Sequence, residues 1–332
     1  MVRRGRGVVP VSRTTQAPFA PRYSPAPTAP AQAPNAVFLF PRPRAATVGF
    51  LCLLVTSLGW GLNWPAMKVL LGELPPLFAR GAAGSVAGLV FVLAALLMGQ
   101  SLAVPRPLLG RVAAAAALNV FAWMGFATVA MRWLSVGQCA LLVYTMPVWA
   151  TLLAWPIRGE RPSLRAVAGL VLCMAGLWQL FGSGGFDLDR DQLVGAALAL
   201  SSAVLFALGT VALRPLIELR PVASLAWQLS LGCIPMLALG LAFERPAVAD
   251  VSATGWALML YMTAVPMGLC YMTWFAALRR VPPTTASLAT LLTPVIGVVA
   301  AAFVLGEPLG PRELMALTLT LAGVALALRR AA

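Results

Sequence analysis

The sequence has no histidine and few charged side chains. Of its 332 residues, 10 are acidic and 24 are basic, so that 10% carry charge, whereas soluble domains carry about 25%. The absence of histidine removes the commonest general base, the usual partner of a serine or cysteine nucleophile, and the usual zinc ligand. HExxH, GxSxG and paired intramembrane acids are also absent. We therefore expect no enzyme, no metal site and no cofactor.

The excess of basic residues gives a formal net charge of +14. These residues punctuate apolar runs and do not cluster in one motif, so we expect no nucleic-acid partner. Hydrophobic residues make up 60% of the chain, and its mean hydropathy is +0.87. This composition predicts a protein that resides in the lipid bilayer.

Charged residues divide the chain into ten long uncharged segments. A charge at the bilayer centre costs at least roughly 2.5 to 3.5 kcal/mol, so charges are expected at the ends of membrane spans. Nine segments reach the length of about 20 residues that a spanning helix needs, and snorkelling arginines would extend the short tenth one. Because no segment alternates like a strand, we predict an all-α integral membrane protein with ten transmembrane helices. The segments are residues 45–67, 81–105, 112–131, 133–157, 166–186, 192–213, 221–243, 251–278, 281–306 and 314–328.

The chain repeats itself with an offset of 147 residues, which brings Arg132 onto Arg279, Pro147 onto Pro294 and Gly159-Glu160 onto Gly306-Glu307. An odd number of crossings in each half inverts the second half relative to the first, as in many transporters. We predict two inverted five-helix repeats. The predicted organisation is a disordered basic Arg/Pro/Ala-rich tail (1–45), a first repeat (46–182), an external linker (183–192) and a second repeat (193–330). A transit peptide is the alternative interpretation of the tail, and its presence in the mature protein stays open.

Lysine and arginine are distributed unequally between the two sides of the predicted bundle. If the N-terminus is cytoplasmic, 18 of the 24 basic residues fall on the cytoplasmic side and eight of the ten acids on the other. The positive-inside rule then predicts a multi-pass protein of the cell (inner) membrane with both termini in the cytoplasm.

Several short motifs follow one another in both halves. The first half has Trp60-Gly61-Leu62-Asn63-Trp64, then Lys68, Pro76, Arg80, Pro147 and Gly159-Glu160, and the second has Trp227-Gln228, Pro294 and Gly306-Glu307. In this order and spacing the chain resembles the EamA-type drug/metabolite transporters over residues 48 to 328, although Phe206 stands where the first half has Trp60. The resemblance implies a ten-helix inner-membrane carrier that exports small metabolites or xenobiotics.

Pro147 and Pro294 lie near the middle of their apolar segments, at equivalent positions. A proline inside a helix frees the carbonyl four residues earlier, here that of Val143 or Thr290, and kinks the helix. Two symmetric breaks near the midplane point to a central solute cavity, and a packing kink relieved by neighbouring helices is the alternative.

Aromatic and amide side chains gather at similar depths of the predicted helices. Spacings of three or four residues place members on shared faces. Such a set suits an amphipathic or cationic solute through stacking and cation-π attraction, whereas many membrane aromatics only form interfacial belts. The amides favour a cavity because an amide in lipid needs a partner. The candidates are Trp60, Asn63, Trp64, Asn119, Trp123, Tyr144, Trp227, Gln228, Tyr271, Trp274, Thr290 and Thr293.

Two cations join these cavity candidates. Lys68, the single lysine, lies one turn from the end of the first predicted helix, and Arg80 lies at the start of the second. Each could bind a solute carboxylate or take part in proton transfer at an outer vestibule, or it could anchor the helix by snorkelling, which we favour for Lys68.

Glu160 and Glu307 occupy matching positions in short connections between helices. A matched catalytic pair is one interpretation. We favour structural caps, with each carboxylate facing the N-terminus of the next helix. No acid or histidine lies inside a span, so proton coupling has no obvious carrier, and facilitated exchange is equally open.

Together these features predict a secondary transporter, an exporter of small metabolites or of amphipathic or cationic compounds that works by alternating access around a midplane cavity. A lipid or lipid-linked solute flippase is the first alternative and would need a cavity that opens laterally to lipid. A non-transporting membrane scaffold would have no polar cavity. The solute, the direction of transport and the oligomeric state stay open; the Gly84 and Gly88 pair fits packing within the bundle, and a homodimer is the other option.

Overall fold

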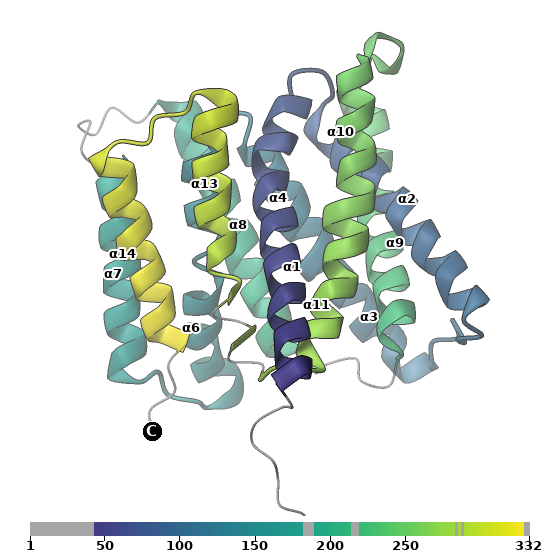
Figure 1. Cartoon of the computed structure of the whole chain (residues 1–332), viewed down its shortest axis with the longest axis horizontal. Coiled ribbons are helices and arrows are strands. Elements are labelled where there is room, and N and C mark those ends of the chain that lie inside the picture. The colour runs from purple at the N-terminus through teal and green to yellow at the C-terminus, as the bar shows by residue number, and fades with distance from the viewer. Residues whose placement is uncertain (1–42, 182–188, 214–218, 283–284, 287–288, 329–332) are drawn as a thin grey trace, which may run out of the picture. The chain divides into compact units, whose positions relative to one another are not determined.

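Helices form all the regular secondary structure that the computed structural model describes (Figure 1). The described residues are 43–181, 189–213, 219–282, 285–286 and 289–328. Two units are distinguished, Met1–Phe40 and Pro41–Ala332, and all described residues belong to the second. Nearly all of the predicted tail and most of the predicted linker lie outside the described residues, so both remain predictions.

The first half of the chain folds into helical segments that follow the uncharged intervals closely. Leucine and alanine dominate these segments, and both are strong helix formers. The segments are α1 (Pro43–Leu70), α2 (Pro76–Leu97), η1 (Arg106–Leu108), α3 (Leu109–Ala115), η2 (Ala116–Ala122), α4 (Trp123–Ala130), α5 (Val136–Val143), α6 (Met146–Arg158) and α7 (Leu164–Phe181).

The second half repeats this order of long and interrupted helices. Its segments are α8 (Arg190–Ala212), α9 (Pro221–Leu239), η3 (Gly240–Glu244), η4 (Val248–Asp250), α10 (Ala253–Ala264), η5 (Val265–Leu269), α11 (Cys270–Leu278), α13 (Leu292–Leu305) and α14 (Pro311–Leu328). Two helices stop at glycines with left-handed backbones, α6 at Gly159 (φ 74°) and α13 at Gly306 (φ 67°). These glycines are one repeat apart, and they end their helices at little conformational cost.

Seven helical segments of the described chain are long and apolar enough to cross a membrane. Two further apolar helices, Leu164–Gln179 and Leu292–Leu305, are shorter. The chain is thus an all-helical, multi-pass membrane protein, and the exact number of ten crossings stays a prediction. The seven segments are Ala45–Leu70, Pro76–Leu97, Arg106–Ala130, Val136–Arg158, Arg190–Ala212, Pro221–Glu244 and Ala253–Leu278.

The most extensive helix interfaces pair α2 with α9 and α7 with α14, and Figure 1 shows the second pair side by side. Glycines allow the close approach of α2 and α9: a Cβ atom on Gly84 would overlap the side chain of Cys233, and one on Gly88 would lie 2.8 Å from Ser230 Oγ. The GxxxG pair therefore serves packing within the chain.

Candidate functional site

The third helical span of each half contains a π-helical turn. In the first half this turn is η2, Ala116–Ala122, and in the second half it is η5, Val265–Leu269. The repeat offset of 147 residues maps the first turn onto residues 263–269, so the two turns are equivalent. A π-helical turn widens the helix, breaks its regular hydrogen bonding and is frequent at functional sites. The bundle thus has two matched π-helical turns, and aromatic candidates lie at both. A third one, η3, ends the span Pro221–Glu244 and has no π-helical counterpart in α2.

One aromatic cluster joins α1 to the helix that follows η5. The ring of Trp60 lies 5.5 Å from that of Tyr271 in an edge-on arrangement and 5.8 Å from that of Trp274. Trp60 Nε1 donates a hydrogen bond of 2.9 Å to the carbonyl of Pro266, inside the π-helical turn. The freed backbone of η5 is therefore what positions the indole of Trp60.

A second cluster lies one turn further along α1. The Trp64 ring is 6.2 Å from the Tyr144 ring at the end of α5, and both side chains are buried. Thr293, at the start of α13, is fully buried, and its Oγ1 has no hydrogen-bond partner among the described residues. Gly297 gives the Trp64 indole its space, since a Cβ atom there would lie 3.2 Å from the ring. Three helices from both halves of the chain thus meet at Trp64.

A third cluster surrounds the first π-helical turn. Trp123 packs on Phe206 of α8 with ring centroids 5.2 Å apart, and Asn119 lies against Gly209 of the same helix. The sequence analysis treated Phe206 only as a departure from the aromatic motif. Its repeat equivalent is Trp60, so each half sets one aromatic ring against the span that contains the π-helical turn of the other half.

Some buried polar atoms of these candidates have no hydrogen-bond partner within the part of the chain that the structure describes. They are Oδ1 of Asn63, Oδ1 of Asn119, Nε1 of Trp123 and Oγ1 of Thr293. Burying such an atom without a partner costs about 1 to 3 kcal/mol. Each of these candidates therefore has a hydrogen-bonding group that its described neighbours leave unsatisfied.

Both proline positions interrupt their helices. The α5 helix ends at Val143 and α6 begins at Met146, directly before Pro147. The α13 helix begins at Leu292, two residues before Pro294. The breaks lie beside Tyr144 and Thr293, and so they border the Trp64 cluster.

Arg80 is buried in the bundle, with 7% of its surface exposed. Its Nε donates a hydrogen bond of 3.2 Å to Thr128 Oγ1 on α4. The side chain therefore does not snorkel to an interface. Thr128 was not among the predicted site residues, because nothing in its local sequence marks it.

Lys68 is half-buried and bonded to the turn between α4 and α5. Its Nζ donates to the carbonyl of Met131 and, at 2.9 Å, to that of Leu134. These carbonyls end the α4 helix and its following turn, where a cation is favourable. The ammonium group is therefore engaged with backbone carbonyls of the first half.

Glu307 caps a helix, but not the one expected. Its carboxylate accepts hydrogen bonds from the backbone N–H groups of Val136 (2.8 Å) and Gly137 (3.3 Å), so it caps α5. The prediction of the next helix, α14, is wrong for Glu307, because Glu313 already accepts the Gly310 N–H there. Glu160 is exposed, and residues 283–284, the repeat equivalents of Val136 and Gly137, lie outside the described residues.

Two further carboxylates act in the same way at the end of the bundle where α2, α5 and α10 begin, which we call the clamp face. Glu244 accepts from the N–H groups of Leu77 (3.2 Å) and Phe78 (2.9 Å), at the start of α2. Glu73 accepts from both N–H and Oγ of Ser252, the N-cap of α10. Each of the three carboxylates belongs to one half of the chain and caps a helix of the other half.

Three predicted candidates stand apart from the aromatic clusters. Trp227 Nε1 donates to the carbonyl of Leu102, in the segment after α2. Gln228 Nε2 donates to Ser224 Oγ on its own helix. Thr290 lies in the turn before α13. No group of three or more metal-binding side chains comes together in the described residues.

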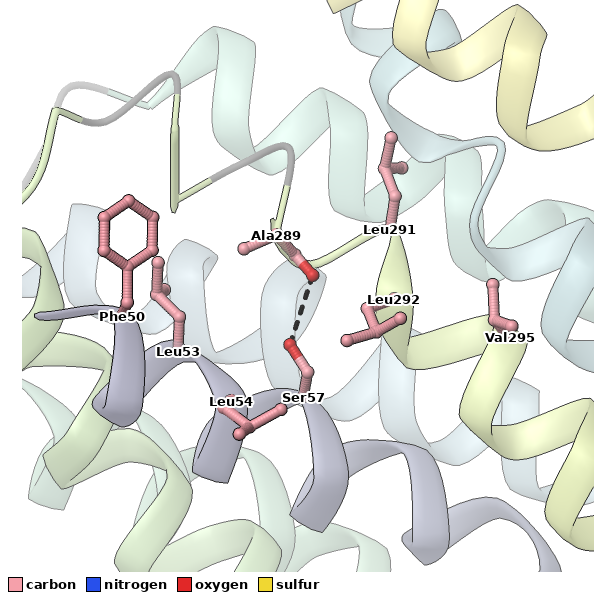
Figure 2. A pocket seen from close by; sticks show the side chains of 8 residues that line it. All are labelled: Phe50, Leu53, Leu54, Ser57, Ala289, Leu291, Leu292 and Val295. Atoms are coloured by element: carbon pink, nitrogen blue, oxygen red, sulfur yellow. Dashed lines mark hydrogen bonds between the residues drawn. The ribbon is translucent and has the colours of Figure 1, made fainter. Parts of the chain in front are cut away.

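An apolar groove lies between α1 and the start of α13, with a volume of about 430 Å³. Figure 2 shows Phe50, Leu53, Leu54 and Ser57 on one side of it and residues 289–295 on the other. The Ser57 hydroxyl donates to the carbonyl of Ala289 (3.1 Å) across the groove. None of the aromatic or amide candidates lines it.

Interrupted spanning helices around buried aromatic and polar groups define a multi-pass membrane protein of the transporter class. The EamA-like transporter family matches residues 47–182 and 193–329, so the chain belongs to that family.

Several bacterial transporters are similar over most of their length. An uncharacterized transporter of Bacillus subtilis, YvbV, is 28% identical and covers 86% of this chain and 92% of its own. A probable amino-acid metabolite efflux pump of Salmonella typhimurium is 26% identical (83% and 93%). A probable terminal-alkyne amino-acid exporter of Streptantibioticus cattleyicolor is 28% identical (84% and 92%). The protein is accordingly a small-molecule transporter and not an enzyme.

A crystal structure also shares the fold. It covers 86% of this chain and 98% of its own, with a TM-score of 0.60 and 21% sequence identity.

Proposed function

We propose that the protein is a secondary transporter that exports small amphipathic metabolites by alternating access, with two inverted five-helix halves rocking about a central cavity. The observation that carries this proposal is the pair of π-helical turns one repeat apart, each facing an aromatic ring of the other half. Discontinuous helices at equivalent points of two inverted repeats are typical of a transport site.

The helix interfaces support the inverted arrangement. The pairs α2 with α9 and α7 with α14 each join a helix to its repeat equivalent. Likewise α1 packs on α11 and α13, while its equivalent, α8, packs on α4 and α6. Such reciprocal contacts are what a pseudo-two-fold axis requires, and the odd number of crossings proposed for each half puts that axis in the membrane plane.

The clamp face supports a closing motion. Its three carboxylates hold the two halves together at one end of the bundle, and access from that end requires these contacts to break. By the positive-inside rule we assign this end to the outside of the inner membrane and both termini to the cytoplasm. The names of the similar exporters, which concern amino-acid metabolites, support amino-acid-like solutes as the first class to examine.

Replacing the Asn119 or Trp64 side chain by alanine should lower the solute flux per folded molecule in proteoliposomes at least about tenfold, because each removes a group that lines the proposed cavity. The matched control is Trp256→Ala, since Trp256 is exposed on α10 and outside the clusters. Flux that is unchanged in both cavity variants would contradict this location of the site.

The groove between α1 and α13 favours one second function, a lipid or lipid-linked solute flippase. It is lined by apolar side chains, of which Phe50, Leu54 and Leu292 are exposed on the lipid-facing surface. A flippase would move fluorescent lipid between leaflets, and Leu292→Trp, which fills the groove, would stop it. The transporter that we propose would instead keep its solute flux in this variant.

A further inference from the structure

Arg80 is a buried cation inside a membrane span, and the structure gives it little compensation. It belongs to the span Pro76–Leu97. A guanidinium has five N–H donors, and in the described residues one of them, on Nε, has a hydrogen-bond acceptor, Thr128 Oγ1. That acceptor is a neutral hydroxyl and not a carboxylate.

The nearby carboxylates are already engaged elsewhere. Glu244 ends η3, and both oxygens of its carboxylate accept backbone N–H groups at the start of α2, the helix that carries Arg80. Glu73 accepts from Ser252. No acid lies inside any of the ten uncharged segments. A buried charge without a counter-ion is costly, and ionisable groups at this depth are functional by default.

The surroundings of Arg80 indicate what would complete it. Gly84, one turn after Arg80 in α2, lies against Met267 of η5. One turn after Met267, the ring of Tyr271 packs edge-on against that of Trp60, and the Trp60 ring lies 5.8 Å from that of Trp274. One side of this region therefore offers a fork of N–H donors, and the other offers aromatic faces. A planar carboxylate attached to an apolar body matches this combination, because arginine binds carboxylates through two parallel hydrogen bonds.

We propose that Arg80 binds the carboxylate of the transported solute, so that the substrates are anionic or zwitterionic molecules with an apolar body. This inference rests on the transport function proposed above and narrows it. The sequence left an amphipathic or a cationic solute open. A buried arginine repels a solute whose only charge is positive, so cationic drugs are disfavoured.

Thr128 acts as a positioning residue for Arg80. Its hydroxyl donates to the carbonyl of Met124 (2.7 Å), which leaves its lone pairs toward Arg80 Nε. Because the hydroxyl hydrogen is used in the bond to Met124, Thr128 Oγ1 can only accept from Arg80. This single acceptor fixes the direction of the Arg80 Nε–H bond and so the orientation of the guanidinium plane. Thr128→Val should raise the KM for a carboxylate solute about threefold and leave the maximal flux unchanged, and Thr128→Ser should restore the KM.

The test uses matched pairs of carboxylic acids and their primary amides, with aliphatic and aromatic bodies, led by L-phenylalanine and L-phenylalaninamide. Flux into proteoliposomes and ligand-induced thermal shifts are measured for the full chain. The wild type should prefer each acid over its amide by at least about tenfold, and Arg80→Gln should abolish that preference. Arg80→Lys, which keeps the charge but loses the fork, should retain part of it.

The control is Arg132→Gln, because Arg132 is exposed and lies over the ring of Trp133. It should leave the preference unchanged. If Arg80→Gln does not fold, Arg80→Lys and Thr128→Val are tested in its place. A preference for the acid over its amide that is unchanged in both variants overturns the inference. Transport of amides as fast as acids would also overturn it while the transport function stands. If no member of any pair is bound or moved, the proposed function and the inference fail together.

Discussion

Gly81→Ala should lower the thermal stability of the protein more than any other single methyl addition in α2. A Cβ atom at this position would overlap the backbone of α9, lying 2.6 Å from the Cα of Leu237 and 2.9 Å from the carbonyl carbon of Met236. Backbone atoms cannot rotate away as a side chain can, so the two helices must separate. We expect a cost of about 3 kcal/mol, the upper end for overpacking, and a melting temperature lower by roughly 10 °C.

Gly240→Ala should have a similar effect from the other side of the contact between α2 and α9, which we call the α2–α9 seam. A Cβ atom there would lie 2.7 Å from the Cα of Phe78 in α2. Because one outward shift of α9 relieves both clashes, the double variant should lose less stability than the sum of the single losses.

Gly110→Ala is the matched control for the seam variants. Gly110 lies in α3, and nothing lies within 4 Å of its added Cβ atom. Alanine is a better helix former than glycine by about 1 kcal/mol, so this variant should be neutral or slightly more stable. Thermal unfolding of the purified protein in lipid nanodiscs measures all four variants. Equal melting temperatures for Gly81→Ala and Gly110→Ala would show that the α2–α9 seam is not tightly packed.

The pattern of charges predicted the approximate positions of the seven long apolar helices, because a bilayer penalises charge strongly enough to dominate local preferences. The helix break before Pro147 could also be predicted, since proline removes a specific backbone hydrogen bond. The π-helical turns could not. In a uniformly apolar segment such as residues 112–131, a helix with a local period above 3.6 leaves no mark on the hydrophobic pattern.

The partners of charged residues were the least predictable part of the site. Glu307 caps a helix whose capped amides lie 170 and 171 residues away in the sequence. Only the packing of α13 against α5 brings them together. Arg80 lies one turn inside α2, which is also where a snorkelling residue would lie. The burial of Arg80 depends on the neighbouring helix α4, which carries Thr128. The position of Arg80 in the sequence therefore does not distinguish a buried cation from a snorkelling anchor.

Weakening the clamp face should open that end of the transporter. The double variant Glu73→Gln with Glu244→Gln keeps the shape of both side chains but removes the charges that accept helix N-terminal N–H groups. Each half-buried cap is worth about 1 kcal/mol, so the closed state should lose about 2 kcal/mol relative to the open one. This loss corresponds to a population of the open state that is on the order of thirtyfold higher.

A cysteine at position 137 would report this opening at the third contact of the clamp face, the one between Glu307 and the start of α5, which the double variant leaves unaltered. A Cβ atom on Gly137 has its closest contacts at 3.8 Å, two of the three being with Val298 of α13, so Gly137→Cys fits between the two halves without strain. In nanodiscs, with the five native cysteines replaced, we expect a water-soluble maleimide to label this cysteine on the order of ten times faster in the double variant. Glu313→Gln is the control, because the Glu313 carboxylate accepts the Gly310 N–H of its own half and so should not affect the labelling rate. If the control accelerates labelling as much as the double variant does, the carboxylates act on general stability. In that case the three clamps do not hold the two halves closed.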